Sequence, residues 1–110
     1  MFKLIFDKVM SKQILSSDKV IKKRLSTLFD KLELQGPRAG KLLDPKLGLY
    51  ELKCINHSIR VYFCYKKDLE EIHVFFFEMK KSKKRQQATI DFVRKKFFIF
   101  LNLFSYTSFL

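Results

Sequence analysis

The side chains of this chain that could act on a substrate are mostly cationic. Five of them lie close together near the C-terminal end: Lys80, Lys81, Lys83, Lys84 and Arg85. With the cations at 94–96 and the single anion Asp91, residues 80–96 carry +7 of the formal net charge of +12. A charge density of this kind attracts polyanions such as nucleic acid, although a solvated charged face is the ordinary alternative.

Other reactive residue types are sparse. His57 falls in a predicted turn, where an exposed histidine is the usual case, and His73 falls inside a predicted strand, where a structural role is favoured. Neither Cys54 nor Cys64 has a partner at metal-ligand spacing. The chain also lacks a glycine-rich phosphate loop and a nucleophile elbow. We therefore expect no metal and no cofactor.

Cations alone still permit one kind of catalysis, the cleavage of RNA through its 2′-hydroxyl. Arg and Lys can stabilise the anionic pentacovalent phosphate, and a Lys among other cations can serve as a base if its pKa is lowered. Such a catalyst is weak on its own. Its rate of cleavage increases most when a larger assembly, such as a ribosome, holds the RNA strand in an in-line geometry.

The elements that would position these residues can be read from hydrophobic periodicity. Residues 18–35 show helical spacing between an N-cap at Ser17 or Asp18 and the Gly36-Pro37 stop. Weaker patterns predict a strand at 2–6 and a short helix at 8–16, and the Gly- and Pro-containing segment 36–48 is typical of a loop. Strands are then predicted at 49–55, 59–65 and 72–79, followed by a helix after Lys80. The predicted fold class is α+β, a small antiparallel sheet in the order β-α-(α)-β-β-β-α with the helices on one face.

Length and composition limit the remaining classes. The chain has 110 residues, which is typical of one domain, and 47% of them are apolar, which excludes a disordered chain. Two cysteines exclude a disulfide-rich scaffold. The N-terminal apolar run is broken by Asp7 and Lys8, and no stretch is long enough to span a membrane. These features predict a cytoplasmic protein with reduced thiols and no membrane partner.

The hairpin formed by the strands at 49–55 and 59–65 has a register that sorts its residues by face. If paired residue numbers sum to 115, Leu52 faces Phe63 and Cys54 faces Val61, giving an apolar side. A slip by one residue would mix charged and apolar residues on both faces. The other, exposed side then carries Glu51, Lys53, Arg60, Tyr62 and Cys64. This register predicts that Lys53 and Arg60 are near diagonal neighbours and that the two cysteines cannot form a disulfide.

Four segments of the chain together resemble a known protein family. They are GPRAGKLL at Gly36–Leu43, GLYELK at Gly48–Lys53, IRVYF at Ile59–Phe63 and FEMKK at Phe77–Lys81. Their order and spacing resemble the RelE/ParE superfamily of type II toxins, and most of all its HigB-like and phage-derived branch. The resemblance covers residues 1–96. The Phe-rich residues 97–110 lie outside the family pattern and are interpreted as an extension of the last helix.

The resemblance implies a RelE-like fold and an mRNA interferase, an endoribonuclease that cuts messenger RNA on the ribosome and is neutralised by a cognate antitoxin. It implies that Arg60, Lys53 and Lys81 are the catalytic cations. Lys80, Lys83, Lys84 and Arg85 would hold phosphates or ribosomal RNA, and Tyr62 on the same sheet face could stack on a base.

Two departures from the family pattern keep other functions open. Gln86 and Gln87 occupy the neighbourhood in which RNA-cleaving members often carry a Tyr or His, and position 53 is Lys rather than Arg, which loses bidentate geometry. One alternative is a ParE-like inhibitor of DNA gyrase. The other is a catalytically degenerate RNA-binding module.

Overall fold

The computed structural model describes residues 1–54, 59–79, 88, 91–92 and 95. Contacts within the chain divide it into one unit from Met1 to Met79 and a second from Lys80 to Leu110. The described residues of the second unit, Ala88, Asp91, Phe92 and Lys95, are all helical, as predicted for this segment. The predicted extension at 97–110 lies outside the described residues, so the division into 1–96 and 97–110 stays a prediction.

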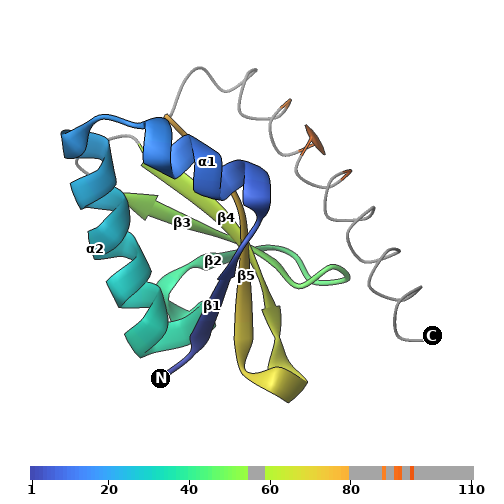
Figure 1. The fold of residues 1–110 in the computed structure, drawn as a ribbon. Coiled ribbons are helices and arrows are strands. Elements are labelled where there is room, and N and C mark those ends of the chain that lie inside the picture. Colours follow the sequence, from blue (N-terminus) through green and yellow to red (C-terminus); the bar gives the residue numbers. More distant parts are fainter. Residues whose placement is uncertain (55–58, 80–87, 89–90, 93–94, 96–110) are drawn as a thin grey trace, which may run out of the picture. The chain divides into compact units, whose positions relative to one another are not determined.

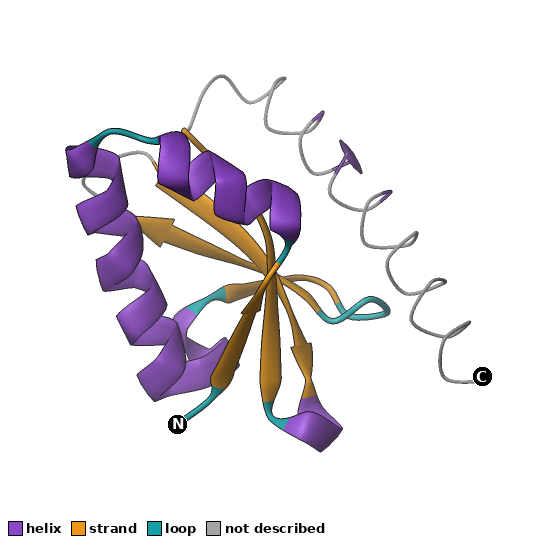
Figure 2. Ribbon diagram, in the orientation of Figure 1, coloured by secondary structure: helices purple, strands orange, loops and turns teal. Residues whose placement is uncertain are grey.

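The first unit is an α+β structure in which two helices cover one face of a five-stranded sheet (Figures 1 and 2). This confirms the predicted fold class. The strand order across the sheet is β1-β5-β4-β3-β2. In chain order the elements are β1 (Lys3–Phe6), α1 (Lys8–Ser16), α2 (Lys19–Gln35), the 3-10 turn η1 (Gly36–Ala39), β2 (Lys41–Asp44), β3 (Leu49–Cys54), β4 (Ile59–Lys66), the 3-10 turn η2 (Lys67–Leu69) and β5 (Glu71–Met79).

The sheet differs from the prediction in two respects. It is mixed rather than antiparallel, because β1 pairs with β5 in parallel. In the sequence, both helices separate β1 from the other strands, so no hairpin turn fixes the direction of β1. The segment expected to be a loop contains β2, which pairs with β3. Four residues between turn-forming Gly40 and Pro45 are too few to show a strand's alternation.

The two helices begin at aspartates and α2 ends at a glycine. The Asp7 carboxylate accepts from the N–H groups of Val9 and Met10, at 3.1 and 3.3 Å, and so caps α1. Asp18, one of the two predicted cap residues, caps α2 by accepting from the Ile21 N–H at 2.9 Å. Gly36 follows α2 with φ +65°, and the Phe2 ring occupies the place that a Cβ would take. This position therefore requires glycine on both conformational and steric grounds.

The core lies between the helices and the sheet face that they cover. Met10 of α1 and the α2 residues Leu25 and Leu32 are fully buried against Val61 and Phe63 of β4. The Phe63 ring also stacks on Tyr50 of β3, with centroids 5.2 Å apart and planes 10° from parallel. This packing fixes which face of β3 and β4 is apolar, and it thereby sends the alternate residues of both strands to the other face.

The pairing of β3 with β4 confirms the predicted faces but shifts the predicted register by two residues. Leu52 pairs with Val61 rather than with Phe63, and Lys53 pairs directly with Arg60 instead of lying diagonal to it. A shift of two residues keeps every side chain on its face, because the side-chain period of a strand is two. The apolar pattern therefore could not distinguish the two registers. The turn itself, residues 55–58, lies outside the described residues.

Candidate functional site

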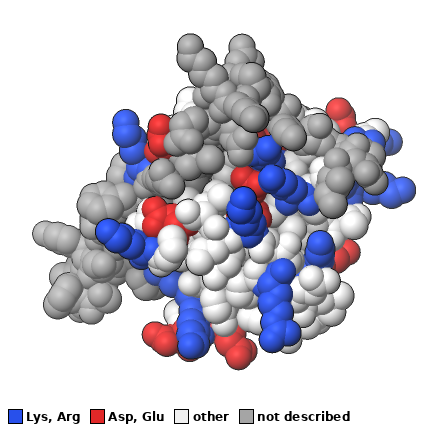
Figure 3. Space-filling view, turned by 180° about the vertical axis from the view of Figure 1, so that it is seen from behind, with Lys and Arg blue, Asp and Glu red and all other residues white. Residues whose placement is uncertain are grey.

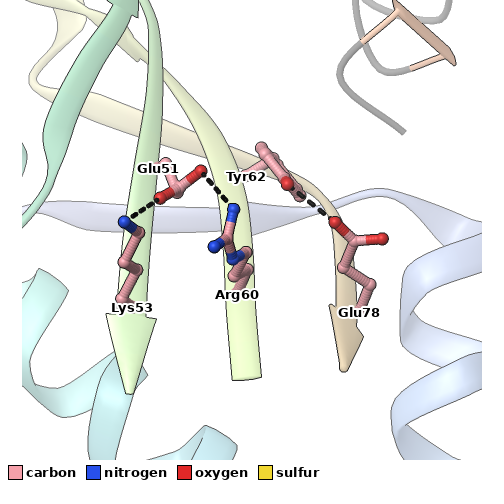
Figure 4. A network of polar contacts seen from close by, with 5 residues as sticks. All are labelled: Glu51, Lys53, Arg60, Tyr62 and Glu78. Atoms are coloured by element: carbon pink, nitrogen blue, oxygen red, sulfur yellow. Dashed lines mark hydrogen bonds and ion pairs between the residues drawn. The ribbon is translucent and has the colours of Figure 1, made fainter. Parts of the chain in front are cut away.

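A group of polar side chains crosses three strands on the sheet face opposite the helices (Figure 4). Glu51 and Lys53 come from β3, Arg60 and Tyr62 from β4, and Glu78 from β5. Lys53, Arg60 and Glu78 form one row across the sheet, and Glu51 lies beside Tyr62 in the next row. We call these five residues the sheet-face polar cluster.

Glu51 bridges the two cations of this cluster. Its Oε1 atom lies 3.4 Å from Lys53 Nζ, and its Oε2 atom lies 3.5 Å from Arg60 Nη1. The Glu51 and Arg60 side chains are only 2% and 4% exposed, whereas that of Lys53 is 49% exposed. For two ions taken out of water, their mutual attraction offsets part of the cost of losing their hydration. Glu51 and Arg60 are therefore coupled, and Lys53 is the cation with open access to solvent.

Tyr62 and Glu78 form the second polar contact of the cluster. The Tyr62 hydroxyl donates to Glu78 Oε1 at 2.8 Å, and its ring stacks beside Phe76. Burial raises the pKa of Tyr62 far above its usual range, the contact with Glu78 raises it further, and a hydrogen bond with Arg60 offsets this only in part. The phenol therefore stays protonated at any physiological pH, so it can donate a hydrogen bond but cannot act as a base.

The expectation that this sheet face is exposed is wrong for Arg60 and Tyr62. Both are buried, and Tyr62 has no exposed surface with which to stack on a base. The prediction treated one face of the hairpin as the apolar one. Leu49 and Cys64, which pair with each other on the polar face, are buried as well. The sheet face that carries the polar cluster thus also has buried apolar residues, and the alternation of polar and apolar residues along the strands does not reveal that they are buried.

The structure brings together three of the predicted site residues, Lys53, Arg60 and Tyr62. The remaining five, Lys80, Lys81, Lys83, Lys84 and Arg85, lie outside the described residues. The prediction assigned no role to Glu51 and Glu78, the two carboxylates of the cluster. Glu51 was detectable, because it lies two residues before Lys53 on the same strand and so shares its face. Glu78 was not, since its place beside Arg60 depends on the β4–β5 register.

Acidic side chains also limit the positive charge of this side of the molecule. Figure 3 shows Asp and Glu among the Lys and Arg of the described residues, seen from behind the view of Figure 1. Within the cluster, Lys53 and Arg60 share the Glu51 carboxylate, and Glu78 adds a second carboxylate beside Arg60, so the cluster as a whole carries no net formal charge. A guanidinium and an ammonium side by side can stabilise a phosphate-sized anion as its charge develops.

The cysteines confirm the predicted absence of a disulfide between them. Cys54 lies on the core side of β3 and Cys64 on the other face of β4, and both are free. Burial raises the pKa of the Cys64 thiol to about 12. At neutral pH this thiol is protonated and is a poor nucleophile.

His73 lies beside Cys64 in the sheet, with its Nε2 atom 3.4 Å from Glu71 Oε2. Burial lowers the pKa of His73, and Lys66 lowers it further, while Glu71 opposes the shift. The folded protein therefore binds a proton at His73 less readily than the unfolded chain does. This arrangement supports the structural role predicted for this histidine.

Because of this shift, we expect the protein to be less stable at acidic pH. The contribution of His73 is complete above the pKa of about 6.5 of an unfolded histidine, and it is lost as pH falls through that value toward the lower pKa in the fold. Urea unfolding at pH 5 and pH 7.5 measures the difference, and His73→Gln should reduce it. An equally large pH dependence in His73→Gln would contradict this assignment.

Among the described residues, no helix is both long and apolar enough to cross a membrane, and no group of potential metal ligands gathers in one place.

Comparison with known proteins finds similarity in structure only. No family model and no curated protein matches the chain. The isolated RelE toxin of E. coli matches with a TM-score of 0.63 at 17% identity, over 84% of this chain and 99% of that one. The E. coli RelBE toxin–antitoxin complex matches with a TM-score of 0.61 at 18% identity, over 76% and 100%. A toxin–antitoxin complex of Mycobacterium tuberculosis matches with a TM-score of 0.61 at 14% identity, over 72% and 98%. The chain therefore has the fold of the RelE toxins.

Proposed function

We propose that this protein is the toxin of a type II toxin–antitoxin system and that it is a ribosome-dependent mRNA endoribonuclease. The observation that carries the proposal is the direct cross-strand pairing of Lys53 with Arg60, on the face of a RelE-type sheet opposite α1 and α2. Two adjacent cations on rigid strands suit a phosphate whose negative charge grows in the transition state.

Each cation has a separate role in the proposed reaction. The 2′-hydroxyl of the RNA gives up its proton to solvent and attacks the neighbouring phosphorus, the bond to the 5′-oxygen of the next nucleotide breaks, and that oxygen takes a proton from solvent and leaves as a hydroxyl, so that a 2′,3′-cyclic phosphate remains. Arg60 stabilises the pentacovalent phosphate, and Lys53, with its exposed amine, makes the first contact with the incoming strand. Lys81 completes the catalytic set, and Lys80, Lys83, Lys84 and Arg85 hold flanking phosphates. The ribosome aligns the strand, which two cations alone cannot do.

The proposed partners follow from the same fold. Structural neighbours include RelE bound to a peptide of the antitoxin RelB, and we propose a cognate antitoxin for this chain. A cytoplasmic location, where ribosomes and messages are found, completes the proposal. Membership of the HigB-like branch is part of it and rests on the four sequence segments at 36–43, 48–53, 59–63 and 77–81.

Induced expression in a bacterial host tests the activity, combined with toeprinting of a translated message. We expect growth arrest and new message ends at ribosome-bound positions, and no cleavage of the same RNA without ribosomes. Growth arrest with intact messages and inhibited DNA supercoiling would instead indicate a gyrase inhibitor.

An RNA-binding module without catalysis is the second candidate. It is favoured by one observation, the burial of Arg60 against a carboxylate, which leaves Lys53 as the accessible cation of the pair. Ribosome co-sedimentation with no message cleavage at any protein concentration would support this candidate over the first.

A further inference from the structure

The buried Arg60 guanidinium contacts Glu51 and the Tyr62 hydroxyl. Its Nη1 atom lies 3.5 Å from Glu51 Oε2 in an ion pair that is not a hydrogen bond, and its Nε atom is also buried and makes no hydrogen bond within the described part of the chain. A guanidinium presents donors in a fixed planar fork, so one anion can occupy one side while another approaches a different side. A buried N–H without an acceptor is costly, which is a reason to expect an acceptor there at some stage of function.

Glu51 is placed to hold the planar Arg60 guanidinium in one orientation. Its backbone belongs to β3, where it pairs with Tyr62 of β4 on one side and Lys41 of β2 on the other. Its side chain is almost wholly buried, and its two oxygens contact two different cations. Because a buried carboxylate in a strand has little freedom to move, the separation of Lys53 from Arg60 depends on it.

We propose that Glu51 is a positioning residue, which anchors the Nη1 corner of Arg60 beside Lys53 and leaves the Nε side for a phosphate of the substrate. This inference rests on the proposed function and adds a residue to it. Glu51 touches neither the RNA nor the reacting atoms. Its effect passes through Arg60.

Kinetics of Glu51→Gln test this role, because glutamine keeps the shape and loses the charge. We expect the kcat of message cleavage on ribosomes to fall by roughly 10–100-fold, the effect of a misplaced catalytic group, while KM changes little. Glu71→Gln is the matched control, since it makes the same change on the same sheet face, and it should leave kcat unchanged. Unchanged kcat with lower KM in Glu51→Gln would show that Glu51 competes with the phosphate, and it would overturn the proposal.

A double-mutant cycle separates positioning from general structural damage. In an Arg60→Ala background, Glu51→Gln should produce no further loss of kcat, because Glu51 then has no guanidinium to position. An equal loss in both backgrounds would overturn the proposal.

A measurement on the unaltered full-length protein covers the case in which Glu51→Gln does not fold. The Nε–H resonance of Arg60, assigned with Arg60→Lys, should shift saturably on titration with inorganic phosphate. The absence of a shift at Arg60 would contradict a phosphate-binding Nε side. A phosphate-dependent shift without any message cleavage would support the arrangement around Glu51 but contradict the proposed enzymatic function. Failure of the positioning proposal and failure of the proposed function therefore give different results.

Discussion

Replacing Arg60 with alanine lowers the rate of message cleavage by about 10²–10³-fold, the usual cost of removing one group that stabilises transition-state charge. The expectation rests on the fixed position of the guanidinium, which is buried beside Glu51 and paired across the sheet with Lys53. Growth after induced expression gives the first readout, and toeprinting of a translated message gives the second. Cells that express Arg60→Ala should grow normally.

Two controls make this result interpretable. Arg24→Ala removes a cation from α2, outside the sheet-face polar cluster, and should remain fully toxic. Arg60→Ala also deprives a buried carboxylate of one partner, which is destabilising, so its folding must be confirmed by circular dichroism at the temperature of the assay. Full toxicity of a folded Arg60→Ala protein would show that Arg60 is not catalytic.

Replacing Phe63 with alanine should have the largest effect on stability. Phe63 is fully buried in the helix–sheet core and stacks on Tyr50. Truncation of such a ring costs about 3–5 kcal/mol, a large share of the roughly 5–15 kcal/mol that stabilises a typical domain. Urea unfolding followed by circular dichroism measures this loss of free energy.

Leu34→Ala is the comparison for this experiment. Leu34 is 71% exposed on α2, so its removal should change the free energy of unfolding by no more than about 0.5 kcal/mol. A loss below about 1 kcal/mol in Phe63→Ala would mean that the core around β3 and β4 is packed differently from the arrangement described.

Much of the fold is predictable because its elements have strong local signals. The periodicity and aspartate cap of α2 define it within one residue, and the alternation of β3 and β4 assigns their faces. The four residues of β2 carry no comparable signal, since four residues do not establish a period. The parallel placement of β1 depends on tertiary packing, which no local pattern encodes.

The candidate site was only partly predictable, for a related reason. Lys53 and Arg60 share a face in both the predicted and the observed register, so the prediction that they are close neighbours is correct although the pairing is shifted by two residues. The burial of Arg60 and its pairing with Glu51 depend on the residues that surround it on that face. The positive charge of an arginine by itself predicts an exposed side chain. The contact of Tyr62 with Glu78 required the β4–β5 register, including the irregularity after Tyr62.

The parallel pairing of β1 with β5 has a consequence for synthesis of the protein. Lys3, in the first strand of the first unit, pairs with Glu71 in the last strand of that unit. Contacts between such distant parts of a chain form slowly and only after both parts exist. The sheet therefore cannot close until β5 has emerged from the exit tunnel, and an unfinished chain exposes the edge of β4 that β5 will cover. Folding of this unit is thus completed only after the whole of β5 has left the ribosome.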